Sequence, residues 1–257
     1  MEVHHHSSPT PGGTQTSRKK WTHYFWEFLM LFLAVFCGFL AENQREHMIE
    51  HQRAKVYAAN LYEELKKDTT TLNSTINNHI TTYGKLDSFC LLSTEKEKRN
   101  ITNGMLYYYS GYITMVNFFS SNNTTIEQLK GSGNLRLMSN NVSQKISEYD
   151  KKNSELENEY RLSRIEFEKM ETLYFKIFDG YFYELITGGN GYNVNRDSVF
   201  ILQPPLVNDD TKLMKEFIGW VKFEAGIYKS QNSTYHIPIK KSAIELLAVL
   251  KKEYHLK

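Results

Sequence analysis

Cysteine and proline are both scarce in this chain, so few covalent or conformational constraints are available to the fold. The 257 residues include only 2 Cys and 5 Pro. Cys37 and Cys90 would lie roughly 80 Å apart if the chain between them is mostly helical, because a helix rises about 1.5 Å per residue. A disulfide needs Cα atoms within about 7 Å of each other, so we expect a fold that does not depend on one.

A strong charge of either sign is also missing. Lys and Arg number 31 and Asp and Glu number 29, which gives a formal net charge of +2. Nucleic-acid-binding proteins usually carry a basic excess or a basic face, so we expect no nucleic-acid partner. The motifs G-x-S-x-G and C-x-x-C do not occur, and the stretch GGNGYN at 188–193 lacks the strand and helix context of a nucleotide site. We therefore expect no cofactor and no enzymatic activity.

One short stretch carries residue types that are capable of metal chemistry. Within REHMIEH, residues 45–51, the side chains of His47, Glu50 and His51 form the H-x-x-E-H pattern of some zinc proteases. A zinc enzyme also needs a third ligand, a bound water and a closed cleft, and such a cleft is hard to build so soon after the apolar run that ends at Ala41. We predict a solvated helical stalk with no catalytic or metal-binding residue. A zinc enzyme is one alternative, and metal binding or pH sensing by the two histidines is another.

The N-terminal region contains a long apolar run. The sequence WTHYFWEFLMLFLAVFCGFLA occupies residues 21–41, and from Tyr24 to Ala41 only Glu27 is charged. As a helix, the stretch from Tyr24 to Ala41 is roughly 27 Å long, which is enough to span the hydrocarbon core of a bilayer. Aromatic residues at its N-terminal end are typical of the membrane interface. These features predict a transmembrane helix at 21–41.

The flanks of this run predict an uncleaved signal anchor. Signal peptidase requires small residues near its cleavage point, whereas the candidate positions carry Phe36, Phe39 or Leu40. Basic residues flank both ends in equal number, but those at 18–20 are dense and those after the run are diluted by glutamates. We therefore predict a disordered cytoplasmic tail at 1–20 and a helical domain at 42–257 outside the cytoplasmic membrane.

Apolar periodicity predicts two long helices in that domain. No helix breaker occurs between Glu42 and Gly84, so the transmembrane helix is expected to continue as a stalk that forms a helix at about 42–92. Its apolar stripe consists of Ala58, Leu61, Leu65, Leu72, Ile76, Ile80, Tyr83 and Leu86. A second helix at about 142–186 has a heptad seam, which consists of Val142, Ile146, Tyr149, Asn153, Leu156, Tyr160, Ser163, Phe167, Met170, Tyr174, Ile177, Tyr181 and Leu185.

The remaining segments complete a predicted all-α fold, in which one transmembrane helix continues into a coiled-coil-like helical bundle. The aromatic run at 101–119 is expected to be helical, with a strand as the alternative. Two C-terminal helices are expected at about 209–230 and 240–254, separated by a break at Pro238. The two long helices are expected to run antiparallel if the chain between them folds back.

Parts of the sequence resemble an uncharacterised family of single-pass inner-membrane proteins of bacteroidete bacteria. The resemblance lies in the start MEVHHH, in the anchor KKWTHYFWEFLMLFLAVFCGFLAENQREHMIEHQR and in the end LKKEYHL. The segment SGNLRLMSNNVSQKISEYD is similar to one in related families of short membrane-anchored helical proteins. The resemblance implies a Gram-negative envelope, a cytoplasmic N-terminus and a periplasmic helical domain. It carries no activity and no catalytic residue over to this chain.

The leading functional hypothesis is a non-enzymatic scaffold or partner-binding protein of the cell envelope. It is motivated by the long heptad seam and by the missing catalytic motifs, and its expected partners are the lipid bilayer and either other envelope proteins or a second copy of this chain. The alternative is a sensory or ligand-binding periplasmic domain that signals through a recruited partner. A zinc enzyme that uses the H-x-x-E-H stretch is the third hypothesis.

Overall fold

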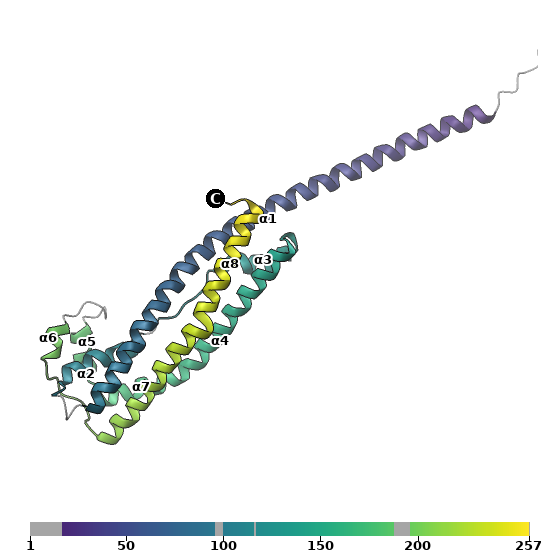
Figure 1. Ribbon diagram of the computed structural model, residues 1–257. Helices are drawn as coiled ribbons and strands as arrows, with labels where there is room; N and C mark the ends of the chain where they lie inside the picture. The colour runs from purple at the N-terminus through teal and green to yellow at the C-terminus, as the bar shows by residue number, and fades with distance from the viewer. Residues whose placement is uncertain (1–16, 96–99, 116, 188–195, 257) are drawn as a thin grey trace, which may run out of the picture. The chain divides into compact units, whose positions relative to one another are not determined.

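The computed structural model describes residues 17–95, 100–115, 117–187 and 196–256 (Figure 1). Throughout these ranges the regular secondary structure is helical, which confirms the all-α prediction. The chain forms two compact units, residues 1–53 and residues 54–257. The first helix, α1 (Ser17–Glu95), begins in the first unit and ends in the second.

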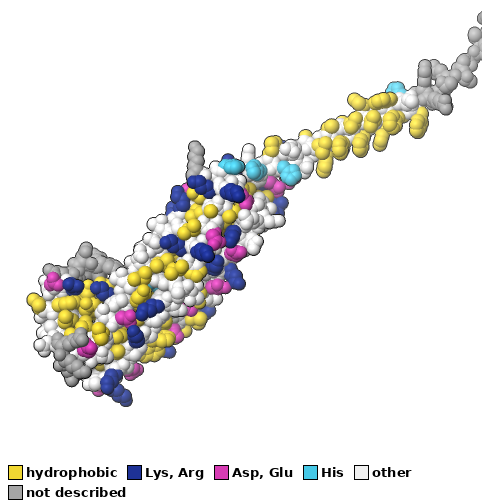
Figure 2. Space-filling view, viewed as in Figure 1, with side chains coloured by type: hydrophobic (Ala, Val, Ile, Leu, Met, Phe, Trp, Pro, Cys, Tyr) yellow, Lys and Arg dark blue, Asp and Glu magenta, His cyan; other side chains and the backbone are white. Residues whose placement is uncertain are grey.

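The first unit is an apolar helix whose side chains are not covered by other parts of the described chain. Between residues 21 and 41 nearly every side chain is exposed, and an 18-residue window has a mean hydropathy of 2.0. Figure 2 shows hydrophobic side chains over this part of α1. Phe28, Phe32 and Phe36 stack along one side, with ring centroids 6.3 and 5.9 Å apart. By length and composition this helix is able to cross a membrane.

The second unit is a bundle built around three long helical segments. These are α1 from Ala54 onward, α4 (Asn140–Ile177), and the C-terminal pair α7 (Thr211–Gln231) and α8 (Ile237–Tyr254). Of the stripe predicted on α1, Ala58, Leu61, Leu65, Leu72 and Leu86 are buried, Ile76 and Tyr83 are half-buried, and Ile80 is exposed. Apolar residues at three- and four-residue spacings therefore face the core, as helical periodicity requires.

Two hydrophobic clusters fill the bundle, one toward each end. The first joins residues 54–72 of α1 to residues 142–156 of α4 and to residues 239–254 of α8. The second joins Leu86 and Phe89 of α1 to residues 170–178 and to residues 217–228 of α7. Residues 54–72 of α1 thus pack near the N-terminal end of α4, and the later residues Leu86 and Phe89 pack near its C-terminal end. The two helices therefore run parallel (Figure 1).

The prediction that the two long helices run antiparallel is therefore wrong, and the reason lies in the chain between them. The helices α2 (Asn103–Ser110) and η1 (Gly111–Thr114) confirm a helical start of the aromatic run, but residues 117–123 form no helix or strand. This segment runs back along α1, because Asn117 contacts His79 and Asn122 contacts Asp68. A chain outside a helix can advance by up to about 3.3 Å per residue, so few residues suffice to return it. The helices α3 (Thr124–Gly131) and η2 (Asn134–Leu137) then precede α4.

The heptad helix ends at Ile177 instead of continuing to residue 186. Phe178 takes an extended conformation with φ −106° and ψ 138°, and its ring is fully buried against Tyr107 and Tyr174. The backbone N–H of Asp179 donates a 2.8 Å hydrogen bond to the hydroxyl of Tyr107. The short helix α5 (Gly180–Thr187) follows, and its Tyr181 is exposed. Burial of Phe178 in an aromatic cluster therefore outweighs continuation of the seam.

The C-terminal segments form one continuous helical path instead of two separate helices. Asp210 caps α7 by accepting hydrogen bonds from the backbone N–H groups of Lys212 and Leu213. A π-helical turn, η3 (Asn232–His236), connects α7 directly to α8, and Pro238 lies in the first turn of α8. A proline lacks the backbone donor of a regular helix, and a π turn is one way in which a helix accommodates such a residue.

A small helix completes the end of the bundle that carries α2 and α5. In α6 (Arg196–Phe200) and the residues after it, backbone carbonyls accept hydrogen bonds from α2 and its N-cap: Thr102 donates to Phe200, and the N–H of Gly104 donates to Leu202 at 3.0 Å. A Cβ atom at Gly104 would lie only 2.0 Å from the carbonyl oxygen of Val199. Glycine is therefore required here for the close approach of two backbones.

Candidate functional site

The residues of the H-x-x-E-H pattern lie on α1 in the first unit. His47 and His51 are exposed and Glu50 is half-buried. Across the described residues, no group of three or more His, Cys, Asp or Glu side chains is placed to hold a metal ion. The structure thus brings no described third ligand to this pattern. The histidines at 4–6 and the GGNGYN stretch lie outside the described residues.

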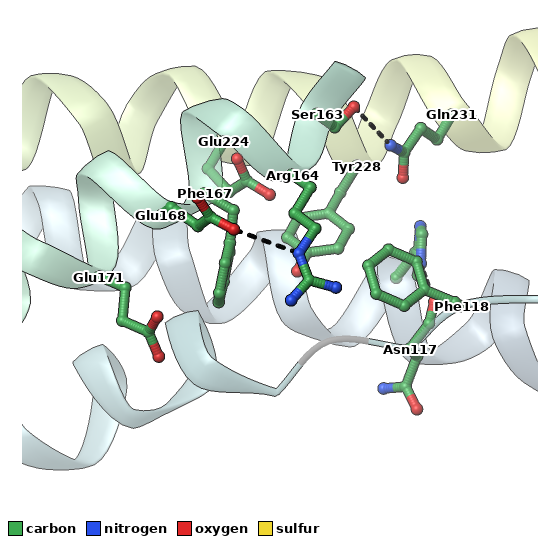
Figure 3. Close-up of a pocket in the computed structure, with 11 residues that line it drawn as sticks. Asn117, Phe118, Ser163, Arg164, Phe167, Glu168, Glu171, Glu224, Tyr228 and Gln231 are labelled. Atoms are coloured by element: carbon green, nitrogen blue, oxygen red, sulfur yellow. Dashed lines mark hydrogen bonds and ion pairs between the residues drawn. The ribbon is translucent and has the colours of Figure 1, made fainter. Parts of the chain in front are cut away.

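A different candidate site lies inside the second unit. It is a cavity of about 270 Å³ between α1, the segment at residues 117–118, α4 and α7 (Figure 3). Its lining residues are His79, Asn117, Phe118, Ser163, Arg164, Phe167, Glu168, Glu171, Glu224, Tyr228 and Gln231. Four segments that are distant in sequence therefore build one pocket.

His79 is a buried histidine in which one ring nitrogen forms a hydrogen bond and the other has no hydrogen-bond partner. Its side chain is 1% exposed, and its Nε2 atom lies 2.9 Å from the carbonyl oxygen of Asn117. Burial lowers the pKa of His79, so the ring is mainly neutral at pH 7. A carbonyl oxygen only accepts hydrogen bonds, so Nε2 carries the proton. Nδ1 has no partner in hydrogen-bonding geometry, although the backbone of Tyr228 lies near enough to raise the pKa slightly.

His236 lies next to His79 and is fully bonded. The two rings are 4.8 Å apart in an edge-to-face arrangement. The amide of Asn232 donates to the carbonyl of Ile76 at 3.1 Å, so its oxygen accepts from Nδ1 of His236 at 2.8 Å. Nε2 of His236 then accepts from the hydroxyl of Tyr160 at 2.6 Å. Burial, with a smaller contribution from His79, lowers the pKa of His236 to about 3, so this network is neutral and structural.

Glu224 is the buried acid of the cavity. Its residue is 6% exposed, and none of the described residues forms a hydrogen bond or an ion pair with it. Burial, with a smaller contribution from the negative charge of Glu166, raises the pKa of Glu224 to about 7. A carboxyl group with this pKa is about half ionised at neutral pH. A buried acid without a partner is costly, which makes this residue a candidate for ligand contact.

The remaining lining residues form the walls and the mouth. Phe118, Phe167 and Tyr228 supply aromatic surface, and Phe118 is 54% exposed. Figure 3 shows Arg164 directed toward Glu168, and the Nε atom of Arg164 lies 3.2 Å from Oε1 of Glu168. The lining thus carries three glutamates and one arginine, and that arginine is already paired.

The hydroxyl of the lining residue Ser163 is held by hydrogen bonds. It donates to the backbone carbonyl of Glu159 at 2.9 Å or to the carboxylate of Glu159 at 3.1 Å, and it accepts from the amide of Gln231 at 3.3 Å. The carboxyl of Glu224 is a buried acceptor that lines the pocket without a described partner, and Nδ1 of His79 is unpartnered but enclosed by protein atoms.

Sequence reasoning did not single out His79 or Glu224, although a signal was present. Glu224 falls at the helical spacing of the buried residues Phe217, Val221 and Tyr228. His79 likewise falls between Leu72 and Leu86 on the buried face of α1. A titratable residue inside an apolar stripe is a signal of a buried polar site.

Comparisons of this chain with protein-family models, with curated proteins and with solved structures find no match. The resemblance seen in the N-terminal, central and C-terminal motifs therefore remains an expectation. Function has to be argued from the geometry of this chain alone.

Proposed function

We propose that this protein is a single-pass membrane protein whose helical domain, residues 54–257, is a non-enzymatic module that binds partner proteins of the cell envelope. The observation that supports membrane insertion is the apolar helix at 21–41, whose side chains are exposed. In water, exposed apolar surface costs about 25 cal/mol per Å², so a surface of this kind is stable only when lipid or another protein covers it.

The proposed orientation has the N-terminus in the cytoplasm and the helical domain in the periplasm. Its support is the dense basic cluster at 18–20, because positive residues are retained on the cytoplasmic side. Glu27 lies near the cytoplasmic end of the apolar run and forms a 3.4 Å contact with His23. Polar side chains near the end of a span reach the interface at modest cost.

Membrane insertion is tested by alkaline carbonate extraction of cell membranes. The chain is expected to stay in the membrane pellet, and a Leu33→Arg, Phe36→Arg double substitution is expected to release it, because each arginine near the bilayer centre costs about 3 kcal/mol. The matched control places the same two arginines at the exposed positions Ser154 and Asn158 of α4. Release of the unmodified chain by carbonate would contradict the membrane proposal.

Partner binding is supported by apolar side chains that the described chain leaves exposed on α4 and α7. Leu162 and Ile165 lie one helical turn apart on α4 and are each 55% exposed. Phe223 of α7 is also exposed, and it lines a shallow groove together with Glu166 and Lys169 of α4. Apolar residues within a polar surface are typical of protein interfaces.

The partner test is affinity capture of the tagged full chain from crosslinked cells, with the double variant Leu162→Glu, Ile165→Glu beside it. A specific partner should be captured by the unmodified chain and lost from this variant. The matched control is Ser154→Glu, Asn158→Glu, which adds the same charge to another exposed part of α4. Equal capture by both variants would contradict the placement of the interface, and capture of no partner would contradict the scaffold proposal.

A second candidate function is ligand binding by the helical domain, with the signal passed to a recruited partner. The observation that favours it is the cavity, which is lined by the unpartnered acid Glu224 and by the neutral His79. Concave sites with apolar walls and few convergent polar groups are the usual form of small-molecule pockets.

A further inference from the structure

We propose that the cavity between α1, α4 and α7 binds a small organic cation, specifically a protonated amine that carries a compact apolar group. This inference rests on the second candidate function and names its ligand class. It does not require the scaffold function, because the cavity is lined entirely by residues of the second unit.

The carboxyl group of Glu224 is the first feature of the cavity that favours a cation. It is buried, it lines the cavity, and its described surroundings provide no cation or hydrogen-bond donor to it. Figure 3 shows Glu224 on α7 on the same side of the pocket as Phe167. An ammonium group supplies both the positive charge and the N–H donors that this carboxylate lacks, and such charge-assisted hydrogen bonds are the strong ones.

The second feature is the proton position on His79. Because Nε2 donates to the carbonyl of Asn117 and the ring is neutral, Nδ1 presents a lone pair. This nitrogen is unpartnered but enclosed by protein atoms, so it is not part of the cavity surface. A neutral His79 supplies no positive charge to pair with Glu224, which lines the same cavity. A ligand that donates hydrogen bonds satisfies Glu224, whereas a carboxylate or phosphate ligand does not.

The third feature is the apolar wall. Phe118, Phe167 and Tyr228 line the cavity, and aromatic faces attract cations as well as apolar groups. The volume of about 270 Å³ lies at the small end of ligand pockets, which typically hold about 300–1,000 Å³. A single ring or a short alkyl chain bearing one ammonium group has the matching size.

The fourth feature is the charge of the lining, which disfavours anions. Glu171 on α4 adds a negative charge to the lining, and the positive charge of Arg164 is engaged by Glu168 at the exposed mouth. An anionic ligand would have to displace that ion pair and lie near two remaining carboxyl groups. A cation gains attraction from the same arrangement.

Binding of a cation is also expected to depend on pH. Glu224 is about half ionised near pH 7, so an ammonium ligand has to displace its proton at lower pH. The affinity is therefore expected to rise by about tenfold between pH 6 and pH 8, where simple primary amines stay protonated. The titratable and charged groups that line the cavity or act on Glu224 from the packed elements are His79 of α1 and Arg164, Glu166, Glu168 and Glu171 of α4.

The test is isothermal titration calorimetry of the full chain in lipid nanodiscs with three probes of the same shape. These are phenethylammonium, phenethyl alcohol and phenylacetate, each titrated also into empty nanodiscs. We expect phenethylammonium to bind at least about tenfold more tightly than the alcohol, with phenylacetate the weakest. We also expect proton release on binding at pH 7, seen as an enthalpy that depends on the buffer.

The variant that tests the site is Glu224→Gln, which keeps the shape and removes the charge. It should weaken phenethylammonium binding by at least about tenfold at pH 8 and leave the alcohol unchanged. The matched control is Glu216→Gln, the same substitution at an exposed position of α7 outside the cavity. Thermal unfolding of both variants checks that they fold.

Three outcomes would overturn the inference. Equal affinity for the amine and the alcohol would mean that the pocket does not select a cation, while ligand binding by the domain would stand. No binding of any probe in the millimolar range would remove both the ligand class and the support for a ligand-binding domain. Equal weakening of amine binding by Glu224→Gln and Glu216→Gln would place the amine outside the cavity.

Discussion

The hydroxyl of Tyr149 on α4 donates a 2.6 Å hydrogen bond to Oδ2 of Asp68 on α1, inside the bundle core. Both residues are fully buried. Asp68 also accepts hydrogen bonds from the backbone N–H of Asn122 at 2.9 Å and from its side-chain amide at 2.6 Å. One carboxylate therefore joins three segments: two parallel helices and the chain that returns between them.

Replacing Asp68 is expected to be strongly destabilising. In the variant Asp68→Ala, the hydroxyl of Tyr149 and the two donors of Asn122 lose their acceptor inside the core. Each buried unsatisfied polar group costs about 1–3 kcal/mol, so the free energy of unfolding should fall by about 3 kcal/mol or more. Tyr149→Phe removes one of these bonds and should cost about 1–2 kcal/mol. Urea unfolding of the full chain in mild detergent measures both, and equal losses in the two variants would contradict the central role of Asp68.

Replacing Gly104 by alanine is expected to disrupt the contact between α2 and the residues around α6. The new Cβ atom would lie 2.0 Å from the carbonyl oxygen of Val199 and 2.7 Å from that of Leu202. Backbone atoms have to move to relieve this clash, at a cost of about 1–3 kcal/mol. The matched control is Gly219→Ala in α7, where nothing lies within 4 Å of the new Cβ. That change should be neutral or stabilise by up to about 1 kcal/mol, and a Gly104→Ala variant as stable as the control would refute the close approach.

Glu224 is expected to make the protein less stable as pH rises. Its pKa is raised from 4.5 to about 7 on folding, so the folded state binds more protons than the unfolded state between these values. The free energy of unfolding therefore contains a contribution that falls as pH rises through this window, by about 3 kcal/mol at most. In Glu224→Gln this contribution is gone, so the variant should gain stability relative to the unmodified chain from pH 5 to pH 8. Unfolding measured at several pH values in this range gives the difference, and a constant difference would show that Glu224 does not titrate there.

His236 is expected to make the opposite contribution in acid. Its pKa is lowered from 6.5 to about 3, so the unfolded state binds the extra proton between these values. The stability that this residue contributes is present above pH 6.5 and is lost as pH falls toward 3, by a total of roughly 5 kcal/mol. The imidazole signals of His236 in NMR should stay those of a neutral ring at pH 5. Protonation of His236 near pH 6.5 would refute its burial.

Cys90 is expected to react slowly with alkylating reagents. Burial raises the pKa of its thiol to about 11, and the thiol lies 3.8 Å from the carbonyl oxygen of Ile218. Because the thiolate is the reactive form, the rate at pH 8 should be about 100-fold lower than that of an ordinary thiol. The test chain carries Cys37→Ala, so Cys90 is its one thiol. The control chain carries Cys90→Ala and Ser74→Cys in addition, which places one exposed thiol on the same helix. Similar rates of iodoacetamide labelling for both thiols would contradict the prediction.

Much of the fold was predictable because local periodicity carries it. The apolar stripe of α1 and the seam of α4 up to Ile177 lie on the buried faces, since residues three and four apart share one side of a helix. The candidate site could not be predicted in the same way. His79, Asn117, Ser163 and Glu224 lie on four separate segments, and their meeting depends on how those segments pack.

By itself, the sequence of this protein determined its helical class, its long apolar N-terminal helix and most of its buried faces, because each depends on residues that are close in the chain. The tertiary structure alone decided that α1 and α4 run parallel, because the segment at 117–123 returns along α1 through contacts with His79 and Asp68. It also decided where α4 ends, because the burial of Phe178 against Tyr107 and Tyr174 outweighs the heptad pattern. The cavity follows from the same packing, because its lining residues come from four segments that are distant in the sequence.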